Sequence, residues 1–166
     1  MNAGAYGGEM KDVLKEAVVL TGEGEILTIP VEELEMGYRT SIIKTSGYLV
    51  LEAVISLEEG DQEEIRSRMK ELSDRRTEKQ PLDFPSAGST FKRPEGYFAG
   101  KLIMDSGLRG CRIGGAQVSE KHCGFVINAG GATAKDVRAL MDHVIHTVHE
   151  KFGVTLEPEV KFLGEF

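Results

Sequence analysis

Residues 133–153 read TAKDVRALMDHVIHTVHEKFG and predict the main helix of this 166-residue chain. Thr133 and Asp136 give the start of the stretch a capping-box pattern, and Gly153 stands where many helices end. Between these ends, apolar residues recur at the 3.6-residue period of an α-helix. They are Val137, Leu140, Met141, Val144, Ile145 and Val148. We therefore expect a core helix with one apolar face packed on a sheet.

Three histidines lie on the flank of this helix, at a spacing that can chelate a metal ion. They are His143, His146 and His149. Because no cysteine or carboxylate completes the set at ligand spacing, we expect no metal site.

Short apolar segments on both sides of the helix predict the strands of that sheet. Two of them, residues 116–118 and 124–128, precede the helix, and two more, residues 154–156 and 160–163, follow it. A short helix is expected over residues 98–106. We therefore expect an α/β arrangement with a mixed or antiparallel sheet and packed helices in this part of the chain.

The first part of the chain has its own strand pattern. Apolar residues 17–20 and 26–29 flank the turn sequence GEGE at 22–25, which predicts a hairpin. A turn of helix is expected at 31–36 and a strand at 48–57. That strand would place five apolar side chains on one face: Leu49, Leu51, Ala53, Ile55 and Leu57.

A charged stretch separates these two parts. The composition changes at residues 58–60, and a helix with a thin apolar stripe is expected over residues 61–78. Such a helix lies on a surface or bridges two bodies. We therefore predict an α+β protein with domains at residues 1–57 and 58–166, in which residues 58–80 form the bridging helix.

Composition excludes several classes of function. The net charge of −7 argues against general nucleic-acid binding. No stretch reaches the ~18 apolar residues of a membrane span. Cys111 and Cys123 lack the spacing of a metal or redox motif and are expected to be reduced thiols. We therefore expect a cytoplasmic protein that binds neither nucleic acid nor membrane.

Residues 85–94, PSAGSTFKRP, are the most suggestive stretch for chemistry. Two prolines bracket what is predicted to be a small-residue turn, in which Gly88 would let a ligand approach the backbone. Residues 75–112 around it contain eight basic and four acidic residues. Charge alone leaves two interpretations open, namely a site for an anionic small molecule and a solvated basic face.

Other polar residues stand in breaks between apolar segments. They are Arg39 in YRTS, Gln117 in GGAQVS and Glu159 in EPEV. A serine hydrolase fits poorly, because Ser89 lacks the Gly-x-Ser-x-Gly pattern and no histidine stands as its base. An arginine, a glutamate and a serine instead suit the stabilisation of an enolate and the protonation of its carbon.

Five motifs in a fixed order give the chain a resemblance to a known family. They are NAGAYGGE at 2–9, GYRTS at 37–41, PSAGSTFKRP at 85–94, GGAQVS at 114–119 and EPEV at 157–160. Over essentially its whole length the chain resembles the C-terminal half of the UDP-N-acetylenolpyruvoylglucosamine reductases (MurB), flavoenzymes of peptidoglycan precursor synthesis. Because Leu57 runs directly into the charged helix, it looks like the shorter subtype, which lacks an insertion that covers the UDP.

The resemblance implies three catalytic residues. Arg39 and Glu159 would hold and polarise the carboxylate of UDP-N-acetylglucosamine enolpyruvate, and Ser89 would deliver a proton to the neighbouring carbon. FAD, reduced by NADPH, would supply the hydride, and UDP-N-acetylmuramate would be the product.

The resemblance also implies two sets of binding residues. Lys79 would anchor the diphosphate, and Tyr38 and Gln117 would line the substrate pocket. The loop against the flavin would consist of Gly4, Tyr6, Gly7 and Gly8.

The family's pattern further implies that part of the flavin domain is absent. Residues 1–57 would be a remnant of the FAD-binding domain and residues 58–166 the substrate-binding domain, with a last strand at 160–163 returning toward the active site. The chain alone is then expected to hold no cofactor, to be inactive, and to have exposed edges that allow self-association. The alternative is a non-catalytic module that binds a nucleotide-sugar.

Overall fold

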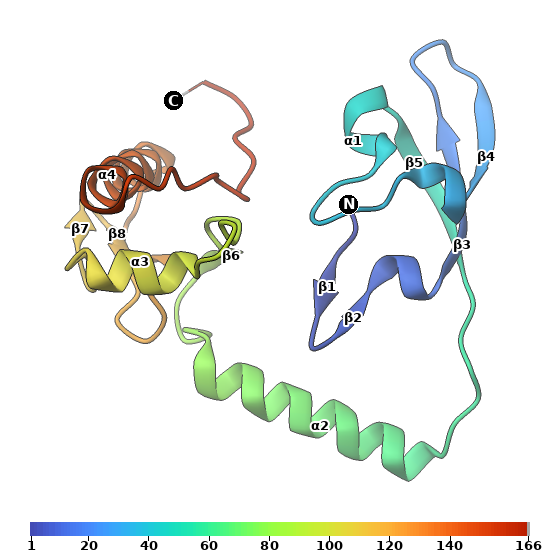
Figure 1. Cartoon of the computed structure of the whole chain (residues 1–166), viewed down its shortest axis with the longest axis horizontal. Coiled ribbons are helices and arrows are strands. Elements are labelled where there is room, and N and C mark those ends of the chain that lie inside the picture. Colours follow the sequence, from blue (N-terminus) through green and yellow to red (C-terminus); the bar gives the residue numbers. More distant parts are fainter. Residues whose placement is uncertain (166) are drawn as a thin grey trace. The chain divides into compact units, whose positions relative to one another are not determined.

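The computed structural model describes residues 1–165 and divides the chain into two compact units, residues 1–62 and 63–166. Each unit has a hydrophobic core of its own, and the elements are labelled in Figure 1. Helices combine with antiparallel sheets in the chain, which confirms the predicted α+β class.

The first unit is built on a three-stranded antiparallel sheet in the order β4-β3-β5. The predicted hairpin is confirmed as β3 (Leu14–Leu20) and β4 (Ile26–Pro30). Its turn closes where the Thr21 amide donates to the Glu25 carbonyl over 2.9 Å. A short 3-10 helix, η2 (Val31–Leu34), packs on β3 and β4, and the helical turn α1 (Ile42–Ser46) follows it.

The predicted strand at 48–57 is β5 (Leu49–Ile55), which pairs with β3 at an edge of the sheet. Its apolar residues are exposed except for half-buried Val54. Leu51, for example, keeps 50% of its surface accessible. The small core of this unit, formed by Leu14, Ala17, Val19, Ile29 and Leu34, draws on β3, β4 and η2. Alternation of apolar residues therefore predicted the strand but not its burial.

The N-terminal segment forms a tight hairpin, although the sequence predicted a loop there. Strands β1 (Gly4–Ala5) and β2 (Gly8–Glu9) pair antiparallel. The two residues between them have positive φ, 53° at Tyr6 and 89° at Gly7. This is the backbone of a two-residue type I′ turn, which matches the twist of the flanking strands. The 3-10 helix η1 (Met10–Asp12) follows.

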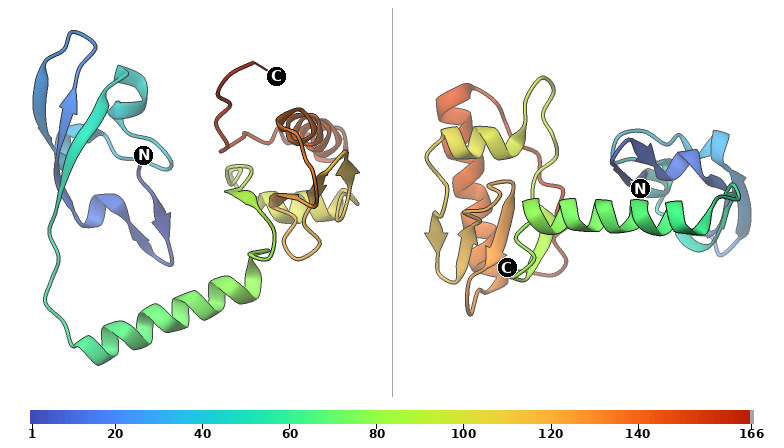
Figure 2. Two further views of the ribbon diagram at one scale, coloured as in Figure 1. Left: turned by 180° about the vertical axis from the view of Figure 1, so that it is seen from behind. Right: turned by 90° about the horizontal axis from the view of Figure 1, so that it is seen from below.

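The second unit is a four-stranded antiparallel sheet in the order β6-β9-β8-β7. Its strands are β6 (Ser86–Ser89), β7 (Arg112–Ile113), β8 (Ala116–Val118) and β9 (Phe125–Asn128). Helix α4 (Ala134–Phe152) packs on β7, β8 and β9, and α3 (Ala99–Asp105) packs against α4 (Figure 2).

The main helix has the predicted ends. Thr133 accepts a hydrogen bond from the Asp136 amide, Asp136 returns one to the Thr133 amide, and Gly153 ends the helix at φ 66°. Leu140, Met141, Val144 and Val148 of α4 are completely buried against the sheet. The predictions of the core helix and of strands at 116–118 and 124–128 are therefore confirmed.

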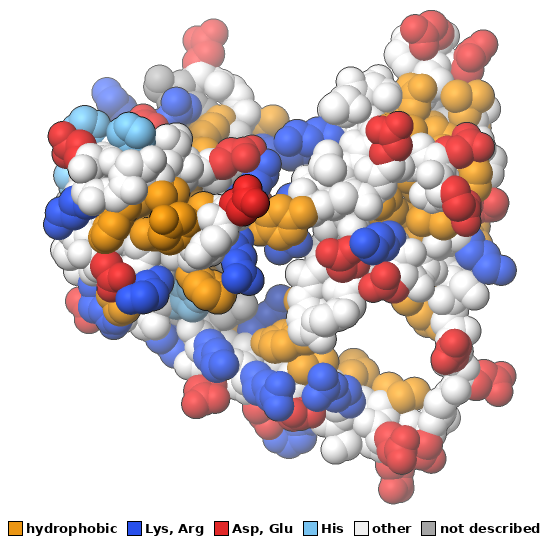
Figure 3. Space-filling view, viewed as in Figure 1, with side chains coloured by type: hydrophobic (Ala, Val, Ile, Leu, Met, Phe, Trp, Pro, Cys, Tyr) orange, Lys and Arg blue, Asp and Glu red, His pale blue; other side chains and the backbone are white. Residues whose placement is uncertain are grey.

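The charged helix is α2 (Gln62–Lys79), in which no side chain is buried. Ion pairs along the helix join Arg68 and Arg75 to Glu71, and Lys70 to Asp74. Lysine and arginine side chains gather over α2 in the view of Figure 3. Within residues 1–165, no helix is both long enough and apolar enough to span a membrane.

The prediction of two strands after α4 is wrong. Residues 154–156 and 160–163 form no regular strand, and the only pairing of this segment described as a β-bridge is the single one between Pro158 and Phe91. Proline has no N–H to donate to a ladder, and Pro85 and Pro94 bracket the partner segment, so the pairing cannot extend far. The predicted last strand at 160–163 is replaced by an irregular segment held at one bridge.

Candidate functional site

Ser89 lies at the end of an edge strand and not in the turn that the sequence predicted. In the pairing of β6 with β9, Ser86 lies opposite Ile127 and Ser89 lies opposite Phe125. β6 therefore has one residue more than β9 between these pairs, which makes a β-bulge. The bulge includes Gly88, whose φ of 84° suits glycine alone without strain. The two prolines resemble turn punctuation, yet the chain between them pairs with β9, and the Thr90 and Lys92 amides donate to the carbonyls of Gly124 and Glu157.

The bulge leaves an open surface beside Ser89. A Cβ added to Gly88 would meet no atom within 4 Å, and the Ser89 side chain is exposed. A bulge at a sheet edge changes the direction of the side chains that follow it, and such bulges are frequent near active sites. A ligand can therefore reach both the Ser89 hydroxyl and the Gly88 backbone.

Thr90 connects Ser89 to the segment that carries Glu159. It is almost fully buried, its amide donates to the Gly124 carbonyl over 2.9 Å, and its hydroxyl accepts from the Val126 amide over 2.9 Å. Its carbonyl accepts from the Glu159 amide over 2.9 Å. The structure therefore brings together Ser89 and Glu159, which are 70 positions apart in the sequence.

The two cations after Ser89 have partners inside the protein. Lys92 forms an ion pair with Glu157, and the Arg93 guanidinium lies 4.0 Å from the centre of the Phe98 ring. Arg93 also donates through Nε to the Tyr97 carbonyl over 3.2 Å. The charge of residues 75–112 left open a site for an anionic small molecule, and the structure shows that these two cations of that stretch make internal contacts.

Arg39 belongs to the first unit and lies in a tight turn between Gly37 and Thr40. The amide of each of these two residues donates to the carbonyl of the other over 3.3 Å. Arg39 has φ 56°, a value that glycine usually provides. Its guanidinium lies 5.3 Å from the centre of the Tyr38 ring. A non-glycine residue held in this region is a form of strain that clusters at ligand sites.

Ser41, just after this turn, has a buried hydroxyl. It makes no hydrogen bond within the described structure. An unsatisfied buried hydroxyl costs free energy, so it calls for an explanation at a functional site.

The predicted flavin loop is the turn of the β1-β2 hairpin. The Tyr6 ring is half exposed, and a Cβ added to Gly7 or Gly8 would meet no atom within 4 Å. An exposed aromatic ring beside unobstructed glycine backbone fits one face of a planar ring system. Gly4, by contrast, packs against the Glu9 side chain. The residues present therefore fit a flavin at Tyr6, Gly7 and Gly8 better than at Gly4.

A polar network holds this hairpin. Buried Asn2 donates to Glu9 Oε2 over 3.0 Å and accepts from the Lys11 amide over 3.1 Å. The Lys11 ammonium lies 2.8 Å from the same carboxylate. Hydrogen bonds from Lys11 and Asn2 lower the pKa of Glu9, and the charge of Arg39 adds to the effect. The ionised form of Glu9 is therefore favoured, and its carboxylate links Asn2 and Lys11 across the hairpin.

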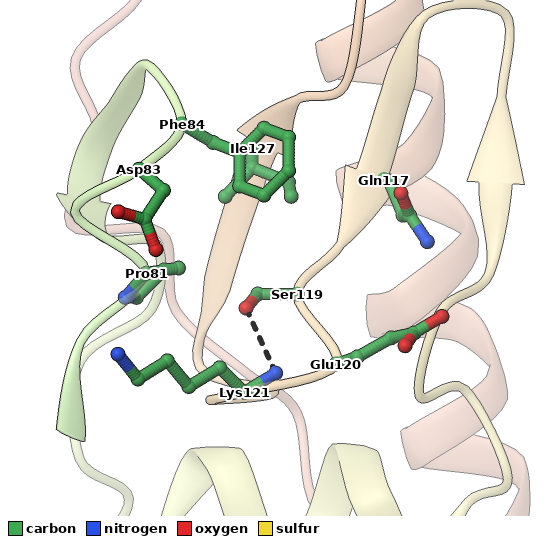
Figure 4. Close-up of a pocket in the computed structure, with 8 residues that line it drawn as sticks. All are labelled: Pro81, Asp83, Phe84, Gln117, Ser119, Glu120, Lys121 and Ile127. Atoms are coloured by element: carbon green, nitrogen blue, oxygen red, sulfur yellow. Dashed lines mark hydrogen bonds between the residues drawn. The ribbon is translucent and has the colours of Figure 1, made fainter. Parts of the chain in front are cut away.

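Gln117 lines an open pocket of about 340 Å³ in the second unit (Figure 4). Its amide donates to the Gly110 carbonyl over 3.3 Å. The other lining residues are Pro81, Asp83, Phe84, Ser119, Glu120, Lys121 and Ile127. The pocket combines an aromatic ring, an amide, a cation and two carboxylates, a mixture that suits a polar organic ligand.

Lys121 was not singled out from the sequence, because it stands in the short turn SEKH without a motif around it. The Ser119 hydroxyl accepts from its amide over 3.2 Å, and its ammonium donates to the Thr77 carbonyl over 2.8 Å. This contact ties the pocket to the end of α2, where Lys79 is exposed. Lys79 itself is not among the residues that line the pocket.

The histidines on α4 make contacts of another kind. His146 lies 3.2 Å from Glu150, and a hydrogen bond of 3.1 Å joins His149 to Thr155. Within residues 1–165 no group of three or more metal-ligating side chains was found that could hold an ion.

Comparison with known proteins gives consistent matches. The family model described as UDP-N-acetylenolpyruvoylglucosamine reductase, C-terminal domain, matches residues 80–163. Reductases of that name from Lachnoclostridium phytofermentans and Agathobacter rectalis are 66% and 62% identical over 99% and 100% of this chain, and the matches cover 53% of each relative. The chain therefore spans about half the length of the curated relatives it matches.

A solved structure is also similar. The crystal structure of the UDP-N-acetylenolpyruvylglucosamine reductase (MurB) from Thermus caldophilus matches with a TM-score of 0.81 and 40% identity. The match covers 96% of this chain and 57% of that one.

Proposed function

This chain belongs to the UDP-N-acetylenolpyruvoylglucosamine reductase family, and we propose from this premise that it supplies the substrate-binding and proton-donating part of that reduction. The substrate would be UDP-N-acetylglucosamine enolpyruvate and the product UDP-N-acetylmuramate, made in the cytoplasm for peptidoglycan synthesis. The observation that carries the proposal is the hydrogen bond from the Glu159 amide to the Thr90 carbonyl, which holds the backbone of a glutamate against the residue that follows an exposed serine.

The reaction adds a hydride and a proton across the carbon–carbon double bond of the enolpyruvyl group. FAD, reduced by NADPH, supplies the hydride when bound, and Tyr6, Gly7 and Gly8 are the residues that would hold it, with Gly4 supporting their turn. Arrival of the hydride at one carbon leaves negative charge on the neighbouring carbon and on the carboxylate conjugated with it. Catalysis therefore requires groups that stabilise this charge before a proton arrives.

Arg39 and Glu159 would bind and polarise that carboxylate. The guanidinium offers two parallel N–H groups that match a carboxylate. A glutamate beside an anion stabilises it only when the glutamate carries a proton or shares one with the substrate. Tyr38, which contacts the Arg39 guanidinium through its ring, would keep that guanidinium in place.

Ser89 would deliver the proton to the carbon. A serine hydroxyl is a weak acid, so it must recover its proton from a neighbour or from water. The exposure of Ser89 on the open side of the bulge supports such a relay. Gln117, with Lys121 in the same pocket, would bind a polar part of the UDP-sugar remote from the reaction, and Lys79 would face its diphosphate.

Replacement of Ser89 by alanine tests the proposal. In the protein that carries this sequence, supplied with FAD and NADPH, Ser89→Ala should lower the rate of substrate reduction by about 10²- to 10⁴-fold, the usual contribution of general acid catalysis. The rate at which NADPH reduces the flavin should not change. Ser86→Ala is the matched control, since Ser86 lies in the same strand and makes only a long hydrogen bond with the Gly88 amide.

Substrate reduction at the normal rate in Ser89→Ala would exclude Ser89 as the proton donor. Calorimetry with the UDP-sugar then separates an enzyme from a pure binding module. If Lys79→Ala and Gln117→Ala weaken binding, Arg39→Ala and Glu159→Gln leave binding unchanged, and no substrate reduction is detected, the chain is a binding module.

A further inference from the structure

The segment that carries Glu159 pairs at one β-bridge with the residues that follow the Ser89 strand. Phe91 and Pro158 form a single antiparallel bridge. On one side of it the Lys92 amide donates to the Glu157 carbonyl over 2.8 Å, and on the other the Glu159 amide donates to the Thr90 carbonyl over 2.9 Å. One bridge with two hydrogen bonds is a short ladder, so its register needs support from side chains.

Lys92 and Glu157 supply a side-chain contact across the same bridge. Their ion pair joins residues 65 positions apart, and the two backbones are hydrogen-bonded at the same two residues. The Lys92 side chain retains 20% of its accessible surface and that of Glu157 retains 66%. The lysine end is therefore partly removed from water, where a charge pair is screened less than on an open surface.

Buried residues anchor both sides of this contact. Phe91, next to Lys92, and Leu156, next to Glu157, belong to the same hydrophobic core. The core fixes where the two segments lie, whereas the ion pair adds a side-chain contact at one end of the bridge, with the Thr90–Glu159 hydrogen bond at the other end.

We propose that Lys92 and Glu157 are positioning residues that hold Glu159 in register with Ser89. The proposal rests on the function proposed above for Ser89 and Glu159. Loss of the ion pair leaves the core intact and allows the Glu157–Glu159 segment to separate more often from the Ser89 strand. Placement errors of about 1 Å in a reacting site can cost about 10²-fold in rate, so a modest loosening is measurable.

The first measurement is amide hydrogen exchange on the chain itself, without cofactor or substrate. In Lys92→Met and in Glu157→Gln, the amides of Lys92 and Glu159 should exchange about 2- to 5-fold faster, the effect expected for one partly exposed ion pair. Amides of β8 and β9 should exchange at the original rate. Lys101→Met is the matched control, because it removes the exposed Lys101–Asp105 ion pair of α3, 2.7 Å long, elsewhere in the unit.

The second measurement separates positioning from direct binding. Lys92→Met should lower kcat for substrate reduction by about 10-fold, within the cost expected from misplacement, and leave the substrate KM and flavin reduction by NADPH unchanged. Lys92→Arg and the charge-swapped pair Lys92→Glu with Glu157→Lys should recover most of the loss. The Lys101→Met control should retain full activity.

Three results would overturn the proposal. The first is unchanged exchange at Lys92 and Glu159 in both single variants. The second is a raised KM without recovery in the swapped pair, which would show that Lys92 binds the substrate directly. The third is normal kcat in Lys92→Met while Ser89→Ala abolishes substrate reduction. If Ser89→Ala is itself active, the proposed function fails, whereas the exchange result still decides whether the ion pair holds the segment.

Discussion

The three-stranded sheet of the first unit and the four-stranded sheet of the second differ in what covers them. In the second unit, β9 has three consecutive buried residues, Phe125, Val126 and Ile127, and α4 packs on the sheet. In the first unit, β5 is also mostly apolar, but all of its residues except half-buried Val54 are exposed. A strand is recognised from its own residues, whereas its burial depends on a partner that can lie anywhere in the sequence.

The residues of the proposed site are also divided between the two units. Ser89, Glu159 and Gln117 belong to the unit with the covered sheet, and Arg39 and the glycine hairpin belong to the other. The well-packed unit fixes Ser89 and Glu159 through buried Thr90. The smaller unit fixes Arg39 and Tyr6 through turns with positive φ and a polar network around Glu9.

The largest expected contrast between the units comes from removing one leucine from each. Leu140→Ala should reduce the free energy of unfolding of the second unit by about 3–5 kcal/mol, because Leu140 is fully buried and its loss leaves a cavity. Leu51→Ala in β5 should cost less than about 1 kcal/mol, because half of that side chain is already in water. Urea unfolding followed at individual residues by NMR measures both. Equal losses would show that β5 is covered in solution.

A smaller contrast is expected at two glycines. A Cβ on Gly115 would overlap the backbone of Gly130 and Ala132, whereas a Cβ on Gly22 would meet no atom within 4 Å. Gly115→Ala should therefore destabilise the second unit by about 1–3 kcal/mol or more. Gly22→Ala should leave the first unit within about 0.5 kcal/mol of the original stability. The same unfolding experiment tests both variants, and a neutral Gly115→Ala would contradict the close approach of these loops.

The helix caps give the next contrast. Thr133 accepts a hydrogen bond from the Asp136 amide at the start of α4, whereas Ser41 makes no such bond at the start of α1. Thr133→Ala should cost about 1 kcal/mol of stability. Ser41→Ala should cost nothing measurable, since it removes a buried hydroxyl without a hydrogen bond in the described structure. Thermal unfolding of both variants checks the pair, and a large loss in Ser41→Ala would reveal a partner for that hydroxyl.

The smallest contrast concerns pH. Hydrogen bonds from the Thr133 backbone and hydroxyl lower the pKa of Asp136 in the second unit, and those from Lys11 and Asn2 lower the pKa of Glu9 in the first. A carboxyl whose pKa is depressed on folding stabilises the protein above its ordinary pKa, about 3.9 for Asp and 4.3 for Glu. That stability is lost as the pH falls through the lower, folded value. Asp136→Asn and Glu9→Gln should therefore each flatten the acid dependence of one unit only.

Exchange measured between pH 2 and pH 6, a range that brackets the ordinary carboxyl pKa values, distinguishes the two variants. A change in both units from either variant would show that their acid unfolding is coupled.

Much of the local structure followed from the sequence because its signals are local. The capping box and Gly153 predicted the ends of α4, the apolar period predicted the helix between them, and the GEGE turn predicted the β3-β4 hairpin. The prediction of two strands after α4 failed because the pairing of a strand is not a local property. Residues 154–163 have suitable apolar side chains, but a strand also needs a partner edge, and the structure provides one bridge at Pro158.

Part of the candidate site followed from the sequence as well. Ser89, Arg39 and Glu159 were named from their motifs, and the adjacency of Ser89 and Glu159 came only from the structure. Lys121 was missed because no motif surrounds it. The pairing of Lys92 with Glu157 was missed because neither residue type nor spacing indicates a contact between residues 65 positions apart.

The sequence by itself determined the family, the class of fold and the helices and hairpins whose hydrogen bonds close within a few residues. The tertiary structure decided which strands are covered, that residues 86–89 form a bulged strand and not a turn, and that the Glu159 backbone is hydrogen-bonded to Thr90, the residue after Ser89. The physical reason is that burial and long-range pairing depend on distant partners, and no local pattern specifies a distant partner.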